Sequence, residues 1–288
     1  MKKSKNMFNL LKTIQFIIII ISIASCNSTN YKSVNNSDNS LRIISLVPSV
    51  TKELVTLGMI ENIVGATSYC DITATNKNLI VSSAIDVNIE KVLLLKPDIV
   101  FASSLIKQKD ITTLQNNNIK VHMLGKMYSF NEICKHFIEI GKIVGKDDVA
   151  NTIVDRSKQR VDSIINTIPS HSDSLKVFFQ IGTQPIFSVI KNTYMDDFIT
   201  FAGCKNIMDD LNHGTVTRES ILHRNPDIIL ISIMGIAGNN EINVWNSYPE
   251  LNAVKNNNVF VINSVLATSP TVLSFVKTFE DVVNCVYH

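Results

Sequence analysis

The chain has 288 residues, and its 27 Lys and Arg against 25 Asp and Glu give a formal net charge of +2. A hydrophobic fraction of 45% with 18% charged residues excludes a chain that is disordered throughout. The small net charge gives no support to a nucleic-acid partner. At about 150 residues a domain, the length predicts two domains.

Residues 1–25 have the pattern of a secretory signal. Four lysines and no acid accompany a short apolar run that ends in Ile23-Ala24-Ser25-Cys26. The run is shorter than the about 20 apolar residues that a transmembrane helix needs. Small residues directly before a cysteine resemble the lipobox of bacterial lipoproteins, which implies cleavage, acylation of Cys26 and a flexible polar tether over 26–40. An uncut signal anchor is the alternative.

An internal repeat is the clearest pattern in the rest of the chain. IEKVLLLKPDIVFAS at 89–103 and RESILHRNPDIILIS at 218–232 are 129 residues apart and agree at six of fifteen positions. Each segment has a helical pattern, a Pro that ends it, an Asp, and then a continuous apolar run. Such a run is typical of a buried strand in a parallel sheet.

The alternation of strands and helices predicts an α/β fold built from two lobes. We expect Rossmann-like lobes with parallel sheets at 41–128 and 170–288. The apolar residues of 129–169 recur at helical spacing on both sides of Gly145, which predicts a single long helix that joins the lobes. Two lobes joined in this way have a cleft between them, where ligands of α/β proteins bind.

The repeat places Glu90 and Glu219 at equivalent positions in the first turn of their helices. They are either ordinary acids at a helix start, where the dipole favours them, or a matched pair that meets arginines of a two-fold symmetric partner.

Four cysteines remain for the mature chain if Cys26 carries lipid. In an oxidising compartment they can pair in three ways, and we favour a disulfide between Cys204 and Cys285, which both belong to the second lobe.

In their order along the chain, several segments resemble the substrate-binding proteins of ABC importers for cobalamin, siderophores and haem. They are RIISLVPSVTKEL, IVGATSYCD, NIEKVLLLKPDIVFAS, VTRESILHRNPDIIL and WNSYPELNAVKNNNVFVI. The resemblance covers about residues 41–285. It implies the class III periplasmic binding protein fold and a monomer on the outer side of a bacterial membrane. It also implies a permease dimer with ATPase subunits as partner, with Glu90 and Glu219 docking onto permease arginines.

Ser68-Tyr69-Cys70-Asp71 is most similar to the cobalamin-binding branch, in which the tyrosine faces the corrin ring. The resemblance therefore implies a cleft that contains Ser68, Tyr69, Asp71 and the aromatic Phe187. The alternative for each of them is an ordinary residue at a strand end that does not contact a ligand.

The chain also departs from the cobalamin binders. They carry aromatic residues where this chain has Ala84, Ser103 and His213, and an Arg near the position of Ala267. His213 is therefore either an exposed loop residue or an axial metal ligand opposite Tyr69. A corrinoid is the first expectation for the ligand, and haem and a ferric siderophore remain open.

Neither an enzyme nor a resident metal site is expected. The sequence has no Gly-x-Gly-x-x-Gly, Walker, His-Glu-x-x-His or Gly-x-Ser-x-Gly motif, and its histidines lack ligand spacing. A two-lobed glycosyltransferase and a zinc- or manganese-binding lipoprotein are the rival classes. We predict a binding protein without catalysis and without an intrinsic cofactor.

Overall fold

The structure is a computed structural model that describes residues 40–83, 85–169, 175–233 and 237–287. The predicted signal segment 1–25, the lipid-anchor residue Cys26 and nearly all of the tether 26–40 lie outside the described residues, as does Ala84. The chain divides into two units, Met1–Ser40 and Leu41–His288, and the account below concerns the second. Among the described residues, no helix is both long and apolar enough to cross a membrane.

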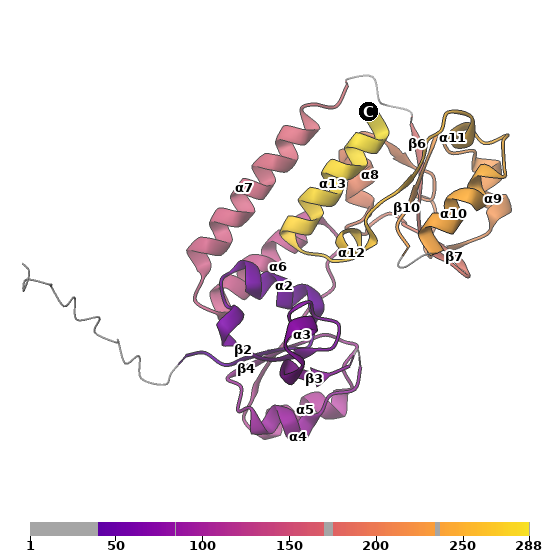
Figure 1. The fold of residues 1–288 in the computed structure, drawn as a ribbon. Helices are drawn as coiled ribbons and strands as arrows, with labels where there is room; N and C mark the ends of the chain where they lie inside the picture. The colour runs from indigo at the N-terminus through magenta and orange to yellow at the C-terminus, as the bar shows by residue number, and fades with distance from the viewer. Residues whose placement is uncertain (1–39, 84, 170–174, 234–236, 288) are drawn as a thin grey trace, which may run out of the picture. The chain divides into compact units, whose positions relative to one another are not determined.

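The first half of this unit is built on five parallel strands in the order β3-β2-β1-β4-β5 (Figure 1). The strands are β1 (Ile43–Ser45), β2 (Ile63–Thr67), β3 (Ile80–Ser82), β4 (Ile99–Ala102) and β5 (Lys120–Met123). Ile43 belongs to the core on one face of the sheet, and Ile44 belongs to the core on the other. Both faces are therefore covered, as the continuous apolar strands predict. The connecting helices are α2 (Pro48–Thr56), α3 (Ile72–Thr75), α4 (Ile89–Leu94) and α5 (Gln108–Asn116), with short 3-10 turns at Ile60–Asn62 and Lys77–Leu79.

The second half has a mixed sheet in the order β11-β10-β6-β7-β9, and β8 also pairs with β6. β6 (Lys176–Thr183), β8 (Lys205–Asn206), β10 (Ile228–Ile231) and β11 (Val259–Val261) are parallel. β7 (Ile186–Ser188) and β9 (Thr215–Val216) run antiparallel to their neighbours. The helices of this half are α8 (Asp196–Phe201), α9 (Arg218–Arg224), α10 (Ala237–Asn246), α11 (Asn252–Lys255) and α12 (Ser264–Ala267).

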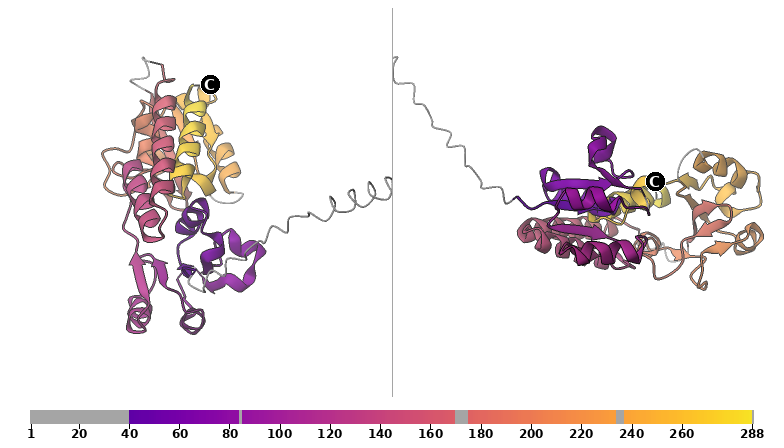
Figure 2. Two further views of the ribbon diagram at one scale, coloured as in Figure 1. Left: turned by 90° about the vertical axis from the view of Figure 1, so that its left-hand side faces the viewer. Right: turned by 90° about the horizontal axis from the view of Figure 1, so that it is seen from below.

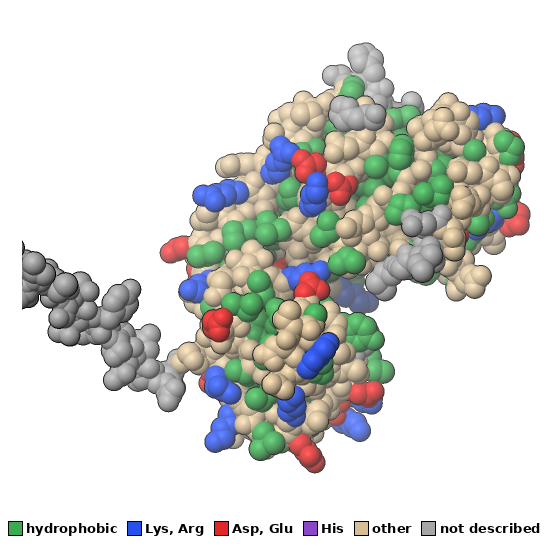
Figure 3. All heavy atoms as spheres, viewed as in Figure 1, with side chains coloured by type: hydrophobic (Ala, Val, Ile, Leu, Met, Phe, Trp, Pro, Cys, Tyr) green, Lys and Arg blue, Asp and Glu red, His purple; other side chains and the backbone are tan. Residues whose placement is uncertain are grey.

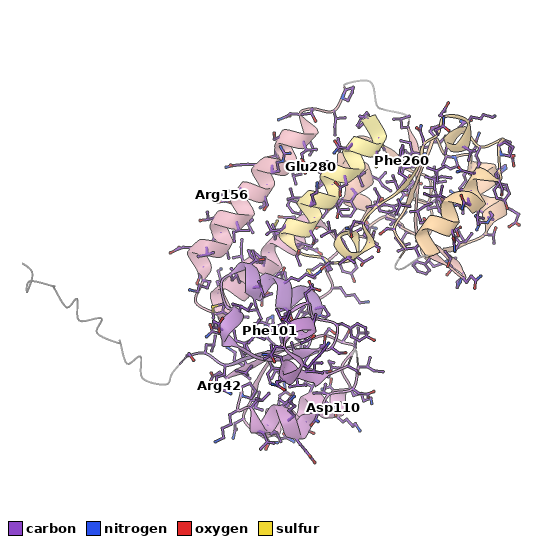
Figure 4. All side chains as sticks on the ribbon, viewed as in Figure 1. Arg42, Phe101, Asp110, Arg156, Phe260 and Glu280 are labelled. Atoms are coloured by element: carbon purple, nitrogen blue, oxygen red, sulfur yellow. The ribbon has the colours of Figure 1, made fainter. Side chains whose placement is uncertain are left out.

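The sequence repeat is also a repeat of hydrogen bonds. The carboxylate of Asp98 accepts the backbone N–H of Arg42 (2.7 Å), and that of Asp227 accepts the N–H of Lys176 (2.9 Å). The side chains of the same two basic residues donate to the carbonyls of Leu95 and Arg224, which are again 129 residues apart. Figure 4 labels Arg42 where the described chain enters the first sheet. Each Pro-Asp therefore ties the end of a helix to the start of a neighbouring strand in the same way.

The link between the halves differs in one respect from the single long helix that the sequence predicts. It consists of two helices, α6 (Phe130–Ile143) and α7 (Asp147–Ile165), which pack against each other. The chain reverses at Gly145, whose φ of +68° lies in the region that favours glycine. At Gly141 a Cβ atom would lie 2.5 Å from the Cβ of Ala150, so this glycine permits the close approach of the two helices. The C-terminal helix α13 (Val272–Tyr287) runs beside α7 and also contacts α6 (Figures 1 and 2).

Aromatic side chains join the linking helices to the second half. The ring of Phe275 on α13 stacks on Phe130 of α6 at 4.3 Å and on Phe198 of α8 at 4.6 Å. The backbone N–H of Phe130 also donates to the Asp197 carboxylate (2.7 Å). The start of α6 is therefore attached to α8 directly by a charge-assisted hydrogen bond and indirectly by stacking through Phe275 of α13.

A buried ionisable pair lies between α2 and α6. Oε2 of Glu53 is 3.6 Å from Nδ1 of His136, an ion-pair distance longer than a normal hydrogen bond, and the side chains are 1% and 8% exposed. Neither has a hydrogen-bond partner among the described residues. Burial raises the pKa of Glu53, and the nearby imidazole opposes that rise only in part.

We expect Glu53→Gln to raise the stability at about pH 8 by about 1 kcal/mol, with no gain at about pH 4. Because the pKa is raised on folding, the contribution of this carboxyl is fully present below its ordinary pKa and is lost as the pH rises through the folded value. Thermal unfolding at both pH values measures the difference, and Glu61→Gln, at an exposed position, is the control. A variant that loses more stability at pH 8 than at pH 4 would show instead that the pair stabilises the fold in its charged form.

Candidate ligand-binding site

A hollow of about 470 Å³ is lined by both halves of the unit. The first half contributes Val47, Pro48, Ser49, Lys52, Tyr69 and Asp71, and the second contributes Val265, Thr268, Ser269 and Pro270. In the first half these residues follow the carboxyl ends of β1 and β2, and in the second they follow β11. The hollow thus has the position that ligands of open α/β sheets prefer.

Hydrogen bonds below the turn after β2 hold Tyr69 at this hollow. The Thr67 hydroxyl accepts the N–H of Tyr69 (3.2 Å), and the Thr73 hydroxyl donates to the carbonyl of Cys70 (2.6 Å). The buried Sγ of Cys70 is 3.1 Å from the Thr51 hydroxyl. These hydrogen bonds hold the turn from the protein side, and Tyr69 is 67% exposed, which leaves its ring available to a ligand.

The charges at the hollow balance. Lys52 Nζ is 3.8 Å from the Asp71 carboxylate, which is largely exposed. The remaining polar residues of the lining are Ser49, Thr268 and Ser269, which carry no charge. Over the face that Figure 3 presents, Lys and Arg side chains alternate with Asp and Glu. Neither the lining of the hollow nor the face in Figure 3 carries a cluster of like charges that would select a strongly charged ligand.

A second hollow, of about 420 Å³, lies within the second half. Its lining is mostly apolar and comprises Ile181, Phe187, Ser188, Val189, Ile190, Thr193, Tyr194, Met195, Asn212, His213 and Gly214. Phe187 stands on the short antiparallel strand β7 and is 42% exposed. A Cβ at Gly214 would lie 2.5 Å from its ring, so the absence of a side chain there lets the ring lie against the backbone.

Tyr194 connects the surroundings of the two hollows. Its side chain lines the second, and its hydroxyl donates to the carbonyl of Ala267 (3.1 Å), the residue before Thr268 of the first. Burial raises the pKa of Tyr194 to about 12, so the hydroxyl remains a hydrogen-bond donor at neutral pH.

The structure divides the cleft residues that the sequence suggests. Tyr69 and Asp71 line the first hollow, whereas Phe187 and His213 line the second, and the two linings share no residue. Ser68 is exposed on the Tyr69 turn and lines neither hollow. No group of three or more His, Cys, Asp or Glu in the described part of the chain is arranged to hold a metal ion.

Cys204 and Cys285 are free thiols in the structure, so the disulfide expected between them is not formed. The Sγ of Cys204 is directed instead to the Tyr287 hydroxyl (3.8 Å) and the Ala202 carbonyl (3.6 Å). Burial raises the pKa of both thiols, which makes them less reactive.

Glu90 and Glu219 are exposed in the first turns of α4 and α9. The neighbouring cations are turned toward the protein. Lys91 donates to the carbonyls of Asn78 and Ile80, both at 2.8 Å. Arg218 pairs with the buried Glu241 (2.8 Å) and lies 4.3 Å over the ring of Trp245.

As a result, neither carboxylate forms an ion pair with a described residue. The pKa of Glu219 is held below its ordinary value by hydrogen bonds from its own N–H and from the Thr217 hydroxyl, so it is anionic at neutral pH.

Comparison with known proteins shows the family. The model of a periplasmic binding protein matches residues 43–266, which is more than half of the chain. The chain belongs to the periplasmic binding protein family. An uncharacterized ABC transporter substrate-binding lipoprotein of Bacillus subtilis (strain 168) is 30% identical over 235 residues, which are 79% of this chain and 74% of that protein.

Two further similar proteins have names or descriptions that mention a ligand. The vitamin B12-binding protein of Pectobacterium atrosepticum is 27% identical over 198 residues, which are 66% of this chain and 71% of that protein. A Staphylococcus epidermidis crystal structure, described as a possible iron-binding, periplasmic solute-binding protein, superimposes with a TM-score of 0.75 at 28% identity and covers 86% of this chain and 98% of that one. Family and relatives make this chain a solute-binding protein of the ABC-transporter type with an α/β fold.

Sequence reasoning missed part of this family member's candidate site. Lys52 and Val265 line the first hollow and Tyr194 the second, and none was singled out. Lys52 lies on the helix after β1, and Val265 on the helix after β11. Ligands of α/β proteins bind beyond the carboxyl ends of the strands, and this rule applied to β1 and β11 would have predicted Lys52 and Val265.

Proposed function

We propose that this protein captures a metal chelate, first of all a corrinoid, in the hollow beside Tyr69 and delivers it to an ABC permease. The observation that carries the proposal is the first hollow, which both halves line and into which an anchored turn presents an exposed aromatic ring. The relation to proteins named for vitamin B12 supports the corrinoid. In this proposal the protein binds and releases its ligand without changing it.

The chemistry of the two hollows favours a chelate over a free ion. Aromatic faces such as Tyr69 and Phe187 pack well against flat, apolar ligands. A free transition-metal ion needs three or four converging ligands, and the described residues offer no such group. One lysine and one aspartate in the first hollow suit a chelate with little net charge.

An iron chelate is the second candidate ligand. The similarity to the Staphylococcus epidermidis protein, described as possibly iron-binding, favours it. The same hollows would hold an uncharged ferric siderophore by the same packing. Haem, with its carboxylates, suits them less, because Lys52 is the one cation among the residues that line them and is already near Asp71.

We further propose that the protein works outside the cytoplasm on a lipid attached to Cys26, and that Glu90 and Glu219 orient it on the permease. The Bacillus subtilis relative, which is called a lipoprotein, supports the anchor. The support for docking is that the two exposed carboxylates are equivalent in the repeat and form no ion pair with a described residue. Arginines of a two-fold symmetric permease would supply those cations.

The ligand is tested by thermal unfolding of the soluble chain from residue 27 with cyanocobalamin, haemin, a ferric hydroxamate and free metal salts. We expect cyanocobalamin to stabilise the protein by about 2.7 kcal/mol at a hundredfold excess over Kd. Tyr69→Ala should weaken its binding about tenfold or more, because a central aromatic contact is lost. Tyr128→Ala is the matched control, since Tyr128 is 51% exposed and lines neither hollow. Equal affinity of both variants, or no stabilisation by any chelate, would refute the proposed site.

A further inference from the structure

The equivalence of α4 and α9 extends beyond their glutamates. Val92 and Ile221, again 129 residues apart, are both 0% exposed, so the two helices turn the same face inward. The outward faces must therefore correspond as well. One helical turn after Glu90 that face carries Leu94, and one turn after Glu219 it carries His223.

Leu94 and His223 are both exposed. Leu94 is 80% exposed, more than any other large hydrophobic residue in the described part of the chain. A single exposed leucine has no meaning by itself. Here, however, it shares a helix face with a carboxylate that lacks a described cation, at a position that the repeat fixes independently.

We propose that Leu94 and His223 are the second contacts of the permease-docking surface, one turn beyond the two glutamates. The occupant is the outward-facing surface of the permease dimer, so the inference rests on the proposed function. Each permease subunit would meet a carboxylate through arginine. Next to Glu90, the apolar side chain of Leu94 would become buried on docking. Next to Glu219, the imidazole of His223 would form a hydrogen bond with the permease.

In this proposal each half contacts the permease through a glutamate and one further residue. The glutamates are equivalent, whereas the further residue is Leu94 in the first half and His223 in the second. The carboxylates provide steering over a distance and set the register. Leu94 provides affinity at short range, because its exposed surface leaves water only on docking. Docking is therefore expected to depend on salt through the glutamates and to depend little on salt through Leu94.

The test measures the affinity of the chain from residue 27 for its purified permease–ATPase complex in nanodiscs, at low and at physiological salt. Leu94→Ser is expected to weaken docking about tenfold at both salt concentrations. His223→Ala is expected to weaken it about threefold. Leu273→Ser on α13, where Leu273 is 50% exposed, is the matched control and should leave docking unchanged. Thermal unfolding should show all three variants folded.

Cyanocobalamin binding to each variant separates this inference from the proposed function. If Leu94→Ser docks normally while loss of both glutamates abolishes docking, the inference is overturned and the docking role of the glutamates stands. If loss of both glutamates also leaves docking intact, this inference and the docking proposal fail together. Retained cyanocobalamin binding in the Leu94→Ser variant, with docking weakened about tenfold, is the expected result.

Discussion

Phe275→Ala is expected to lower the free energy of unfolding by about 3–5 kcal/mol, the range for truncating a buried phenylalanine. The side chain is 1% exposed and stacks on Phe130 and Phe198, so the variant loses contacts with two other helices at once. Phe201 also meets its edge at 6.1 Å. The neighbouring rings of α6 and α8 cannot all move to fill the cavity, which places the expected cost near the upper end.

Urea denaturation of the chain from residue 27 measures this cost. In a domain of this size each kcal/mol corresponds to about 2–4 °C in Tm, so the effect is also large in a thermal scan. Phe187→Ala, at a ring that is 42% exposed, is the control and should cost far less. A loss below about 1 kcal/mol for Phe275→Ala would mean that the ring stack does not hold α6, α8 and α13 together.

The double variant Glu90→Ala and Glu219→Ala is expected to abolish uptake while ligand affinity remains unchanged. Truncating one partner of a close charge pair weakens binding more than about tenfold, and here both pairs are lost. Both side chains are exposed, so the free energy of unfolding should change by less than about 0.5 kcal/mol. Uptake of radiolabelled cyanocobalamin by proteoliposomes that contain the permease–ATPase complex measures the effect.

A matched control removes one exposed acid from each half away from the docking helices, as Glu61→Ala with Glu250→Ala. It changes the net charge by the same amount, so it separates local docking from long-range attraction. If the control pair reduces uptake as much as the docking pair, general charge rather than position guides the protein to the permease.

The fold was largely predictable because each half repeats one local pattern. The Pro-Asp of each repeat predicted a helix end and a strand start, and the structure shows Asp98 and Asp227 in equivalent hydrogen bonds. The linking segment was predicted less well. A glycine within a helical pattern is compatible with a continuous helix or a reversal, and the packing of α6 on α7 decides for the reversal at Gly145.

The site was harder to predict, because it depends on which loops of the two halves meet. The resemblance selected Tyr69 and Asp71, which do line a hollow with residues of the second half. It also grouped Phe187 and His213 with them, although β7 and β9 place that pair at a separate hollow. Pairing between two short antiparallel strands is set by tertiary contacts, and little in so short a sequence signals it.

The antiparallel pairing of β7 with β6 and with β9 has no counterpart in the first half, where all five strands are parallel. The repeat is therefore conserved within the molecule at α4 and α9 and broken at the walls of the second hollow. Under the proposed function, the segments that select cargo are physically distinct from those that meet the permease. Exchanging the turn that carries Tyr69 together with residues 182–216 for the corresponding segments of a relative would then alter the ligand while the permease stays the same. The architecture is therefore suited to acquiring new cargo on an existing transporter.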